Sequence, residues 1–302
     1  MNQSCLAVAS DLLGQLIAEG WGIDLHSHSR HSDGEWSPTE LIRDARIQGV
    51  RVMALTDHDT VAGQAEMLTA GAAAGMAIIT GAEITTWVGD RAYHLLCHDL
   101  DPTDEAWAII QSNRRDRIGD YYLALLAQLR ARGYAVRDQD ARTDEGAFVQ
   151  SPISAALLGG GFAPDLKSAQ VLLRSLQLDY PVHIVGTPVE QLSHLLGHDK
   201  ALVSVAHPAR EERGVSNRLN EADLTVMKQL LPLAALEAHH PYHAPNDVRY
   251  YRELATKHGL EVTCGSDAHG WAVNRPPMAS APALCRGFLE RVIDRQMVGS
   301  FA

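Results

Sequence analysis

The chain has 302 residues, of which 46% are hydrophobic and 21% charged, a composition typical of a globular protein large enough for one α/β domain with an inserted module. Its formal net charge of −11 argues against duplex DNA as a partner, because no global positive field is present to hold a nucleic-acid backbone. No apolar run approaches the ~18 residues of a membrane span, so no membrane partner is expected. The four cysteines form no CxxC pair and the N-terminus lacks the basic region of a secretory signal, which favours a cytoplasmic protein with reduced thiols.

Strands and helices are predicted to alternate through the first hundred residues. The best-marked helix begins after Ser37, because Ser37 as N-cap, Pro38 and Glu40 complete a capping box, and Gly49 ends the helix. A second helix is predicted from about 61 to 74. Apolar runs that end in polar residues predict strands over 22–29, 51–59, 77–84 and 92–98.

The same alternation returns near residue 200. Strands are predicted over 201–208, 234–240 and 261–269, with helices over about 220–231 and 244–258. Strands that alternate with helices favour a parallel sheet or a barrel. Nearly every strand ends in polar, reactive side chains, and the carboxyl ends of such strands form the active-site rim of a barrel.

The middle of the chain interrupts this alternation with helical patterns. Helices are predicted over 105–132, where Ile118, Tyr122, Leu125 and Leu129 form one apolar stripe, and over 151–158 and 165–177. We therefore expect a discontinuous barrel domain, residues 1–103 and 181–302, that carries an inserted helical domain, residues 104–180, which caps the substrate.

Histidine and acidic residues at the predicted strand ends point to a metal site. In a strand, residues i and i+2 share one face, so the pairs His26 with His28 and Asp267 with His269 can each meet one ion. Imidazole and carboxylate groups are the usual ligands of Zn, Mn and Fe. Nine candidate ligands lie at or just beyond a predicted strand end: His26, His28, Asp33, His58, Glu83, His94, His207, Asp267 and His269.

Six segments, in chain order, resemble the PHP (polymerase and histidinol phosphatase) superfamily: DLHSHSRHSDG, ALTDHDT, GAEI, YHLL, AHP and GSDAH. They resemble most its stand-alone phosphoesterases, which include nucleoside 3′,5′-bisphosphate phosphatases. The resemblance spans about 23–100 and 200–270. It implies a distorted (β/α)7, TIM-like barrel with a helical insertion at the place noted above.

The resemblance also implies a set of roles. Two to three divalent ions (Mn, Fe, Zn or Mg) would share three positions, with Glu83 bridging the first two, and Glu83, His207 and Asp267 would be catalytic. The three positions are, in order, His26, His28, Glu83 and Asp267; Glu83, His94 and His207; and Asp33, His58 and His269.

Substrate contacts are predicted outside the ligand set. Arg114 and Arg117 match an arginine pair at the start of the family's insertion, and Arg210 matches an arginine that follows the His-Pro motif; guanidinium groups suit phosphate. His243 is the candidate from the histidines that follow the strand over 234–240. The carboxylates next to the ligands are interpreted either as groups that orient imidazoles or as local turn residues: Asp24, Asp57 and Asp59.

The expected function is hydrolysis of a small phosphate monoester, most simply a nucleotide or nucleoside bisphosphate, by a metal-bridged hydroxide. His207, His243 or a metal-bound water would protonate the leaving group. Three alternatives stay open: a 5′–3′ exonuclease on short RNA or DNA, a histidinol-phosphate phosphatase, and a degenerate PHP module that acts only in interactions. No GxxxxGK[ST] or GxGxxG motif supports a kinase or a dehydrogenase.

Overall fold

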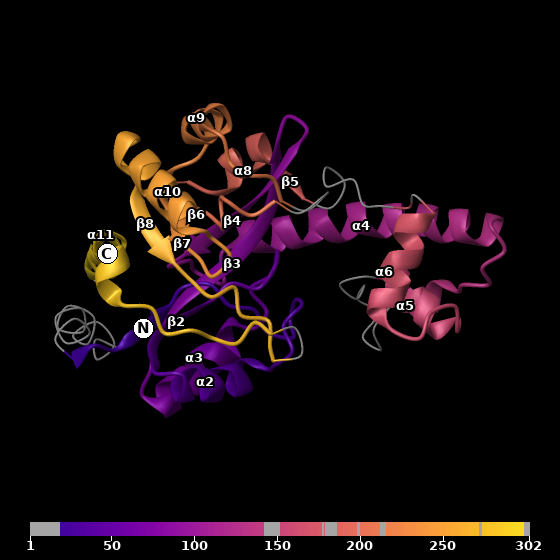
Figure 1. Ribbon diagram of the computed structural model, residues 1–302, viewed down its shortest axis with the longest axis horizontal. Helices are drawn as coiled ribbons and strands as arrows, with labels where there is room; N and C mark the ends of the chain where they lie inside the picture. Colours follow the sequence, from indigo (N-terminus) through magenta and orange to yellow (C-terminus); the bar gives the residue numbers. More distant parts are fainter. Residues whose placement is uncertain are drawn as a thin grey trace.

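The computed structural model describes residues 19–141, 152–176, 178, 186–197, 200–211, 216–271 and 274–298, apart from some helical side chains that include those of 113–118. These residues form a mixed α/β fold around one eight-stranded sheet, whose order is β1-β2-β3-β4-β6-β7-β8 with β5 paired to β3 (Figure 1). The strands are β1 (Gly22–Asp24), β2 (Val50–Leu55), β3 (Ala77–Val88), β4 (Arg91–His98), β5 (Thr187–Pro188), β6 (Leu202–Val205), β7 (Leu233–His239) and β8 (Glu261–Cys264).

Helices cover the outside of the sheet and form a separate group on one side of it (Figure 1). Within the described residues, no helix is both long and apolar enough to cross a membrane. The helices are α2 (Pro38–Ile47), α3 (Gln64–Ala74), α4 (Glu105–Ala131), η1 (Asp138–Ala141), α5 (Pro152–Gly159), α6 (Leu166–Ser175), α8 (Val189–Leu195), α9 (Glu221–Leu230), α10 (Pro245–Lys257), η2 (Pro282–Cys285) and α11 (Arg286–Val298).

Helix α2 shows how directly the sequence sets one element. The predicted capping box is present: the Ser37 hydroxyl accepts a hydrogen bond from the backbone N–H of Glu40, and the Glu40 carboxylate accepts one from the N–H of Ser37. The buried face of the helix, Leu41, Ile42 and Ala45, then packs on strand β2. This packing holds the loop that precedes α2 against the sheet.

Strand β4 departs from the predicted parallel arrangement. It pairs antiparallel with β3 on one side and with β6 on the other, because β3 and β4 are joined by a tight hairpin whose Gly89 adopts a positive φ of 60°. Strand β3 also runs to Val88, beyond the predicted end at residue 84. As a result, Glu83 and His94 lie inside the two strands of the hairpin, whereas the sequence analysis expected them at strand ends.

Four further strands are shorter than predicted. Strand β1 ends at Asp24, β2 at Leu55, β6 at Val205 and β8 at Cys264, so the polar residues that follow each strand lie in loops. These loops leave the ladder because their side chains and backbone bond with one another, as in the hydrogen bond from Thr56 N–H to the Ser27 carbonyl (2.8 Å). The loops still emerge on the same side of the sheet.

The first and last strands approach each other. The backbone N–H of Leu25 donates to the carbonyl of Cys264 (3.2 Å), and Ser27 and Ala268 form an isolated bridge. The approach requires Gly265, because a Cβ there would lie 2.2 Å from the Cβ of His26. The mixed α/β class is thus confirmed, whereas a closed (β/α)7 barrel stays a prediction.

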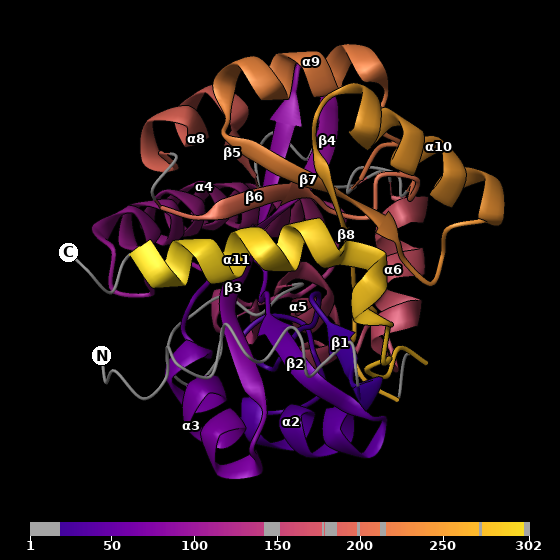
Figure 2. The same cartoon turned by 90° about the vertical axis from the view of Figure 1, so that its left-hand side faces the viewer.

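Helix α11, which the sequence analysis did not predict, crosses the sheet on the side opposite α4 to α6 (Figure 2). Its buried residues Phe288, Leu289 and Val292 share an apolar cluster with Ile23 and Ile79. This cluster lies where the parallel strands begin. The polar ends of the same strands lie at the other end of the sheet, where the candidate site is found.

The three predicted helices between β4 and β5 are present as α4, α5 and α6. Helix α4 begins against the sheet core through Trp107 and Ile110, and its far half joins α5 and α6 in a separate apolar cluster that contains Tyr122, Leu125 and Leu129. Figure 1 places α5 and α6 at the far end of α4, away from the sheet. The domain boundaries at 103, 104 and 180 stay predictions, and so does the capping role.

Candidate metal centre

The buried carboxylate of Glu83 lies at the centre of a ring of imidazoles. Its Oε1 is 3.0 Å from His94 Nδ1 and 3.1 Å from His207 Nε2. Its Oε2 faces three further imidazole nitrogens at 3.1–3.3 Å, those of His26, His28 and His58. One carboxylate therefore faces two separate sets of nitrogen ligands, as expected for a bridging group.

The remaining predicted ligands lie around the same centre. Asp267 Oδ1 is 3.4 Å from His26 Nε2 and 3.3 Å from His28 Nε2, and Asp33 Oδ2 is 2.8 Å from His269 Nε2. The candidate ligand atoms form three groups, and within each group all atoms lie within 4.8 Å of one another. The groups are His26, His28, Glu83 and Asp267; His28, Asp33, His58 and His269; and His58, Glu83 and His94. All nine residues named from the sequence are thus brought together, while their roles as ligands stay a prediction.

The backbone holds two of these side chains in an uncommon conformation. His207 has a φ of 25° and Asp267 a φ of 53°, both in the left-handed region that non-glycine residues avoid. Such a conformation costs of order 1–3 kcal/mol and persists only where the surroundings enforce it. At His207 the enforcing contact is the hydrogen bond from its N–H to the Glu237 carboxylate (2.6 Å).

Glu237, which the sequence analysis did not name, orients His26. Its two oxygens lie 3.0 and 3.2 Å from His26 Nδ1, and both residues are fully buried. A carboxylate on Nδ1 directs the other ring nitrogen of a histidine toward a metal. The available signal was an acidic residue inside the otherwise apolar segment AALEAHH.

Asp24 and Asp57 hold loops in place. Asp24 accepts hydrogen bonds from the N–H and hydroxyl of Ser266 (2.9 and 2.5 Å), and Asp57 accepts from those of Ser29 (2.6 and 2.7 Å). Asp59 likewise accepts from the Thr85 N–H at 3.0 Å. These contacts favour the local-turn interpretation for the carboxylates.

Electrostatics prepare several of the groups for ion binding. Burial lowers the pKa of His58 to about 3 and that of His207 to about 4, so both imidazoles are neutral near pH 7. Burial alone would raise the pKa of Glu83, but the neighbouring His58 and His26 hold it well below its usual range. Burial lowers the pKa of His28, but the carboxylates of Asp33, Asp267 and Glu83 together raise it to about 10. An ion at this place would displace that proton.

The donor set fits divalent cations. Buried polar atoms normally have hydrogen-bond partners, yet Glu83 Oε2 and His58 Nδ1 are buried without one among the residues that the structure describes. Both atoms face the common centre of the cluster. Nitrogen and carboxylate donors in this proportion suit Zn, Mn or Fe, with neutral imidazoles supplying most of the bonds.

Two arginines flank the candidate ligand Asp267. Its Oδ2 accepts from Arg210 Nη1 at 3.0 Å and from Arg275 Nη1 at 3.1 Å, so one oxygen faces the imidazoles and the other the guanidinium groups. Arg210 was predicted, whereas Arg275 was missed because no motif marks it. The arginines of α4, Arg114 and Arg117, have side chains outside the part that the structure describes, so their predicted contacts stay untested.

The predicted substrate residue His243 is engaged by the backbone. Its Nδ1 lies 2.9 Å from the carbonyl of Ala238, and its Nε2 accepts from the N–H of Ala209 at 3.3 Å. With both ring nitrogens occupied, the geometry lends no support to direct substrate contact. His240 is nearer to the ligands: its buried Nε2 is 3.7 Å from Asp267 Oδ2 and has no hydrogen-bond partner.

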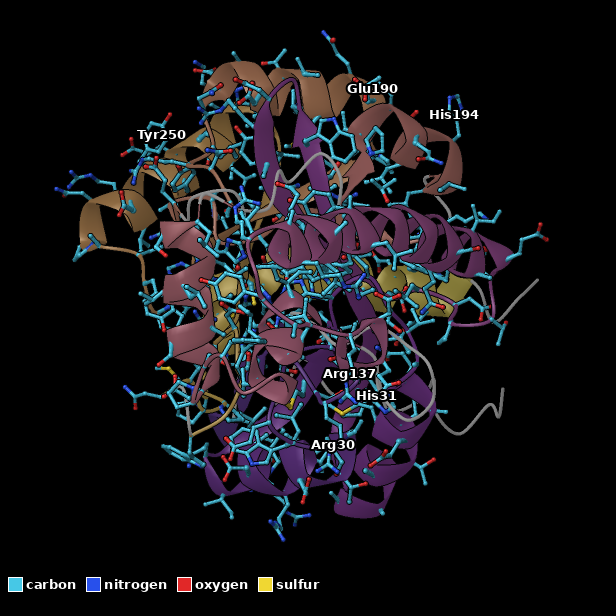
Figure 3. The ribbon with its side chains drawn as sticks, turned by 90° about the vertical axis from the view of Figure 1, so that its right-hand side faces the viewer. Arg30, His31, Arg137, Glu190, His194 and Tyr250 are labelled. Atoms are coloured by element: carbon cyan, nitrogen blue, oxygen red, sulfur yellow. The ribbon has the colours of Figure 1, made fainter. Side chains whose placement is uncertain are left out.

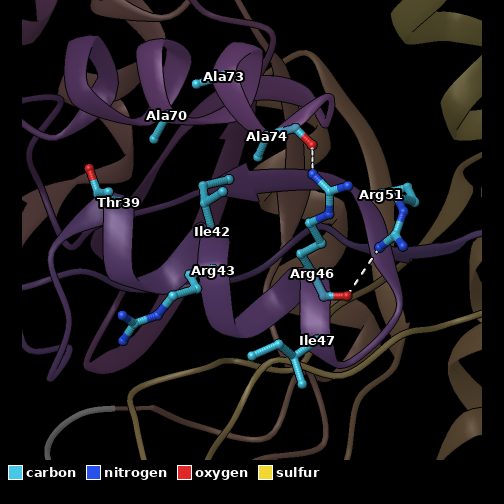
Figure 4. A pocket seen from close by; sticks show the side chains of 9 residues that line it. All are labelled: Thr39, Ile42, Arg43, Arg46, Ile47, Arg51, Ala70, Ala73 and Ala74. Carbon is cyan, nitrogen blue, oxygen red and sulfur yellow. Dashed lines mark hydrogen bonds between the residues drawn. The ribbon is translucent and has the colours of Figure 1, made fainter.

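A separate open cleft of about 550 Å³ lies on the outer side of α2 and α3 (Figure 4). It contains none of the nine candidate ligands. Thr39, Ile42, Arg43, Arg46, Ile47, Arg51, Ala70, Ala73 and Ala74 line it. The guanidinium groups of Arg46 and Arg51 already donate hydrogen bonds to backbone carbonyls.

Comparison with known proteins finds a matching domain and several similar chains. Residues 24–136 match the PHP domain family. A 3′,5′-nucleoside bisphosphate phosphatase of Chromobacterium violaceum is 29% identical over 252 residues, which cover 82% of this chain and 87% of the relative. A 5′-3′ exoribonuclease of Haemophilus influenzae is 47% identical over 93 residues, 30% of this chain and 34% of the relative.

The fold has a solved counterpart. A crystal structure of a putative metal-dependent phosphoesterase from Bifidobacterium adolescentis superimposes with a TM-score of 0.73 at 24% identity, covering 91% of this chain and 96% of that one. The match of residues 24–136 to the PHP domain agrees with the resemblance found in the sequence analysis. The chain is an enzyme of the metal-dependent phosphoesterase class, as the sequence analysis predicted.

Proposed function

We propose that this enzyme removes a phosphate group from a small nucleotide, with a nucleoside 3′,5′-bisphosphate as the preferred substrate. The observation that carries the proposal is the convergence of the eight other candidate ligands around Glu83, beside two arginines on Asp267. The similarity to the Chromobacterium phosphatase extends over most of both chains, which favours the bisphosphate.

Two to three divalent ions would be held at the three positions predicted from the sequence, with Glu83 shared between the first two. Such ions lower the pKa of a coordinated water and neutralise charge on a phosphoryl group. Three ligand carboxylates supply a charge of −3 and three divalent ions +6. The loaded site is therefore cationic within a chain of net charge −11, and attracts a small anion.

The chain's own residues complete the chemistry. Glu237 fixes the ring of His26, while Arg210 and Arg275 bring positive charge to the edge of the site where a phosphate would lie. A metal-bound water is the candidate proton donor for the leaving group, because His207 is neutral and turns its Nε2 to the candidate centre. Both ring nitrogens of His243 are engaged by the backbone.

A phosphate-release screen tests the proposal. Protein loaded with Mn, Mg, Fe or Zn would be assayed on nucleotides, nucleoside bisphosphates, sugar phosphates and histidinol phosphate. We expect the highest kcat/KM on a nucleoside 3′,5′-bisphosphate, two to three ions per chain by elemental analysis, and no activity after chelation. Activity that survives with only trace metal would overturn the proposal.

The strong local similarity to the Haemophilus exoribonuclease supports a second candidate, stepwise cleavage of short RNA from the 5′ end. Both activities use the same ligand set, so the substrate decides between them. A 5′-phosphorylated oligoribonucleotide would be compared with the bisphosphate under identical conditions. Release of successive mononucleotides at a higher kcat/KM than phosphate release would favour the exoribonuclease.

A further inference from the structure

Tyr242 combines high exposure with a fixed position. It is 54% exposed, yet its hydroxyl accepts a hydrogen bond from Arg275 Nε (3.0 Å), and the guanidinium carbon lies 5.2 Å from the centre of its ring. Its backbone N–H donates to His240 Nδ1 at 3.2 Å. A large aromatic surface held by three contacts has already lost the freedom that binding would otherwise remove.

The position of this ring relates it to the metal centre. Arg275, which holds the ring, also donates to Oδ2 of the candidate ligand Asp267 (3.1 Å). The ring centre of Tyr242 lies 5.4 Å from that of His240, and the His240 ring lies 5.6 Å from that of His207. One side chain therefore separates Tyr242 from a candidate ligand in each of two directions: Arg275 toward Asp267, and His240 toward His207.

Two other exposed aromatic residues, Trp271 and Tyr250, lack this combination. Trp271 is 52% exposed, but its indole N–H donates to Asp44 on α2. Tyr250 is 43% exposed on α10, where its ring packs against Tyr251, and Figure 3 shows it on the outer surface. Among these, only Tyr242 is tied through Arg275 to a candidate metal ligand.

We propose that Tyr242 is the platform on which the base of the substrate nucleotide stacks while its phosphate lies at the metal centre. The inference rests on the proposed function. Bases stack on tyrosine without regard to their identity, because every base has a π-face. The platform would thus select nucleotides over other phosphate esters and accept any of the common bases.

The experiment compares a nucleoside 3′,5′-bisphosphate with the same bisphosphate built on a ribose that carries no base. Metal-loaded wild type, Tyr242→Ala and Tyr242→Phe would be assayed on both, with Tyr250→Ala as the matched surface control. Calorimetry would add the dissociation constants of a nucleoside monophosphate and of inorganic phosphate. These binding constants report stacking without any turnover.

For Tyr242→Ala we expect kcat/KM on the nucleotide to fall by about 5- to 100-fold, mostly through KM, and much more than on the base-free compound. Tyr242→Phe keeps the ring and should retain most of the preference, and Tyr250→Ala should match wild type. Equal losses on both substrates, or no loss on either, would overturn the platform. If wild type hydrolysed neither bisphosphate, the proposed function would fail instead.

Discussion

Glu237 offers a sharp test of how the candidate centre is organised, through the change Glu237→Gln. The carboxylate receives two buried donors, the Nδ1–H of His26 and the backbone N–H of His207. A glutamine fits the same space but has a single acceptor oxygen, and its amide N–H₂ group would face whichever donor is left. One buried donor therefore loses its acceptor, and the tautomer of His26 is no longer enforced.

The size of the effect follows from these contacts. An unpaired buried donor costs about 1–3 kcal/mol, which we expect as the loss in free energy of unfolding of the metal-free protein. Loss of a carboxylate that orients a ligating histidine typically weakens metal affinity by about 10–100-fold. Activity should return toward the wild-type level at saturating metal, since no predicted ligand is removed.

Urea unfolding in the presence of a chelator would give the stability, and competition with a chromophoric chelator would give the metal affinity. Glu221→Gln is the matched control, because Glu221 pairs with Lys257 at the surface. Reduced stability with metal affinity within threefold of wild type would refute the orienting role. If both the stability and the metal affinity stayed at the wild-type values, Glu237 would not be the acceptor on which His26 and His207 depend.

Three further predictions concern other residues. Glu83→Ala should lose more bound metal and more activity than Asp33→Ala, because only Glu83 faces two sets of nitrogen ligands; equal losses by elemental analysis would contradict bridging. Arg117→Ala should lower kcat/KM on a nucleotide by at least about tenfold but affect a small aryl phosphate much less, since one charged contact is worth about 1.5–3 kcal/mol; equal losses would assign Arg117 to the fold. Burial lowers the pKa of His98 to about 4 from 6.5. The contribution of its neutral ring to the free energy of unfolding is therefore fully present above pH 6.5 and is lost as the pH falls toward 4. His98→Gln should therefore remove up to about 3 kcal/mol from the change in unfolding free energy across that range, and an unaltered pH dependence would exclude His98 as a cause.

Local sequence signals predicted the elements that depend on local chemistry. The capping box at Ser37 and the apolar stripe that includes Tyr122 predicted α2 and α4, since both features act within a few turns of helix. The positions of Glu83 and His94 were less well predicted. Their type was recognised, but the antiparallel hairpin that places them side by side depends on pairing between strands and not on either segment alone.

The supporting residues were the hardest to predict. Glu237 and Arg275 carry no motif, and their importance arises from partners 211 and 8 residues away in the chain, His26 and Asp267. A single acidic residue in an apolar strand suggests burial with a partner, but which partner is settled only by the packing of the sheet. Conversely, Asp24 and Asp57 stand next to ligands in the sequence and yet serve the backbone of neighbouring loops.

The pairing of β4 with β6 has a consequence for how such an enzyme changes over evolution. Leu95 pairs with Val205 and His98 with Leu202, although α4, α5 and α6 all lie between the two strands in the chain. The ladder itself contains no residue of α5 or α6, although the start of α4 packs on the sheet core through Trp107 and Ile110. Evolution could therefore replace α5 and α6 while the hairpin that carries Glu83 and His94 stays the same. If the inserted segment caps the substrate as predicted, such a replacement would adapt the same metal centre to other phosphate esters.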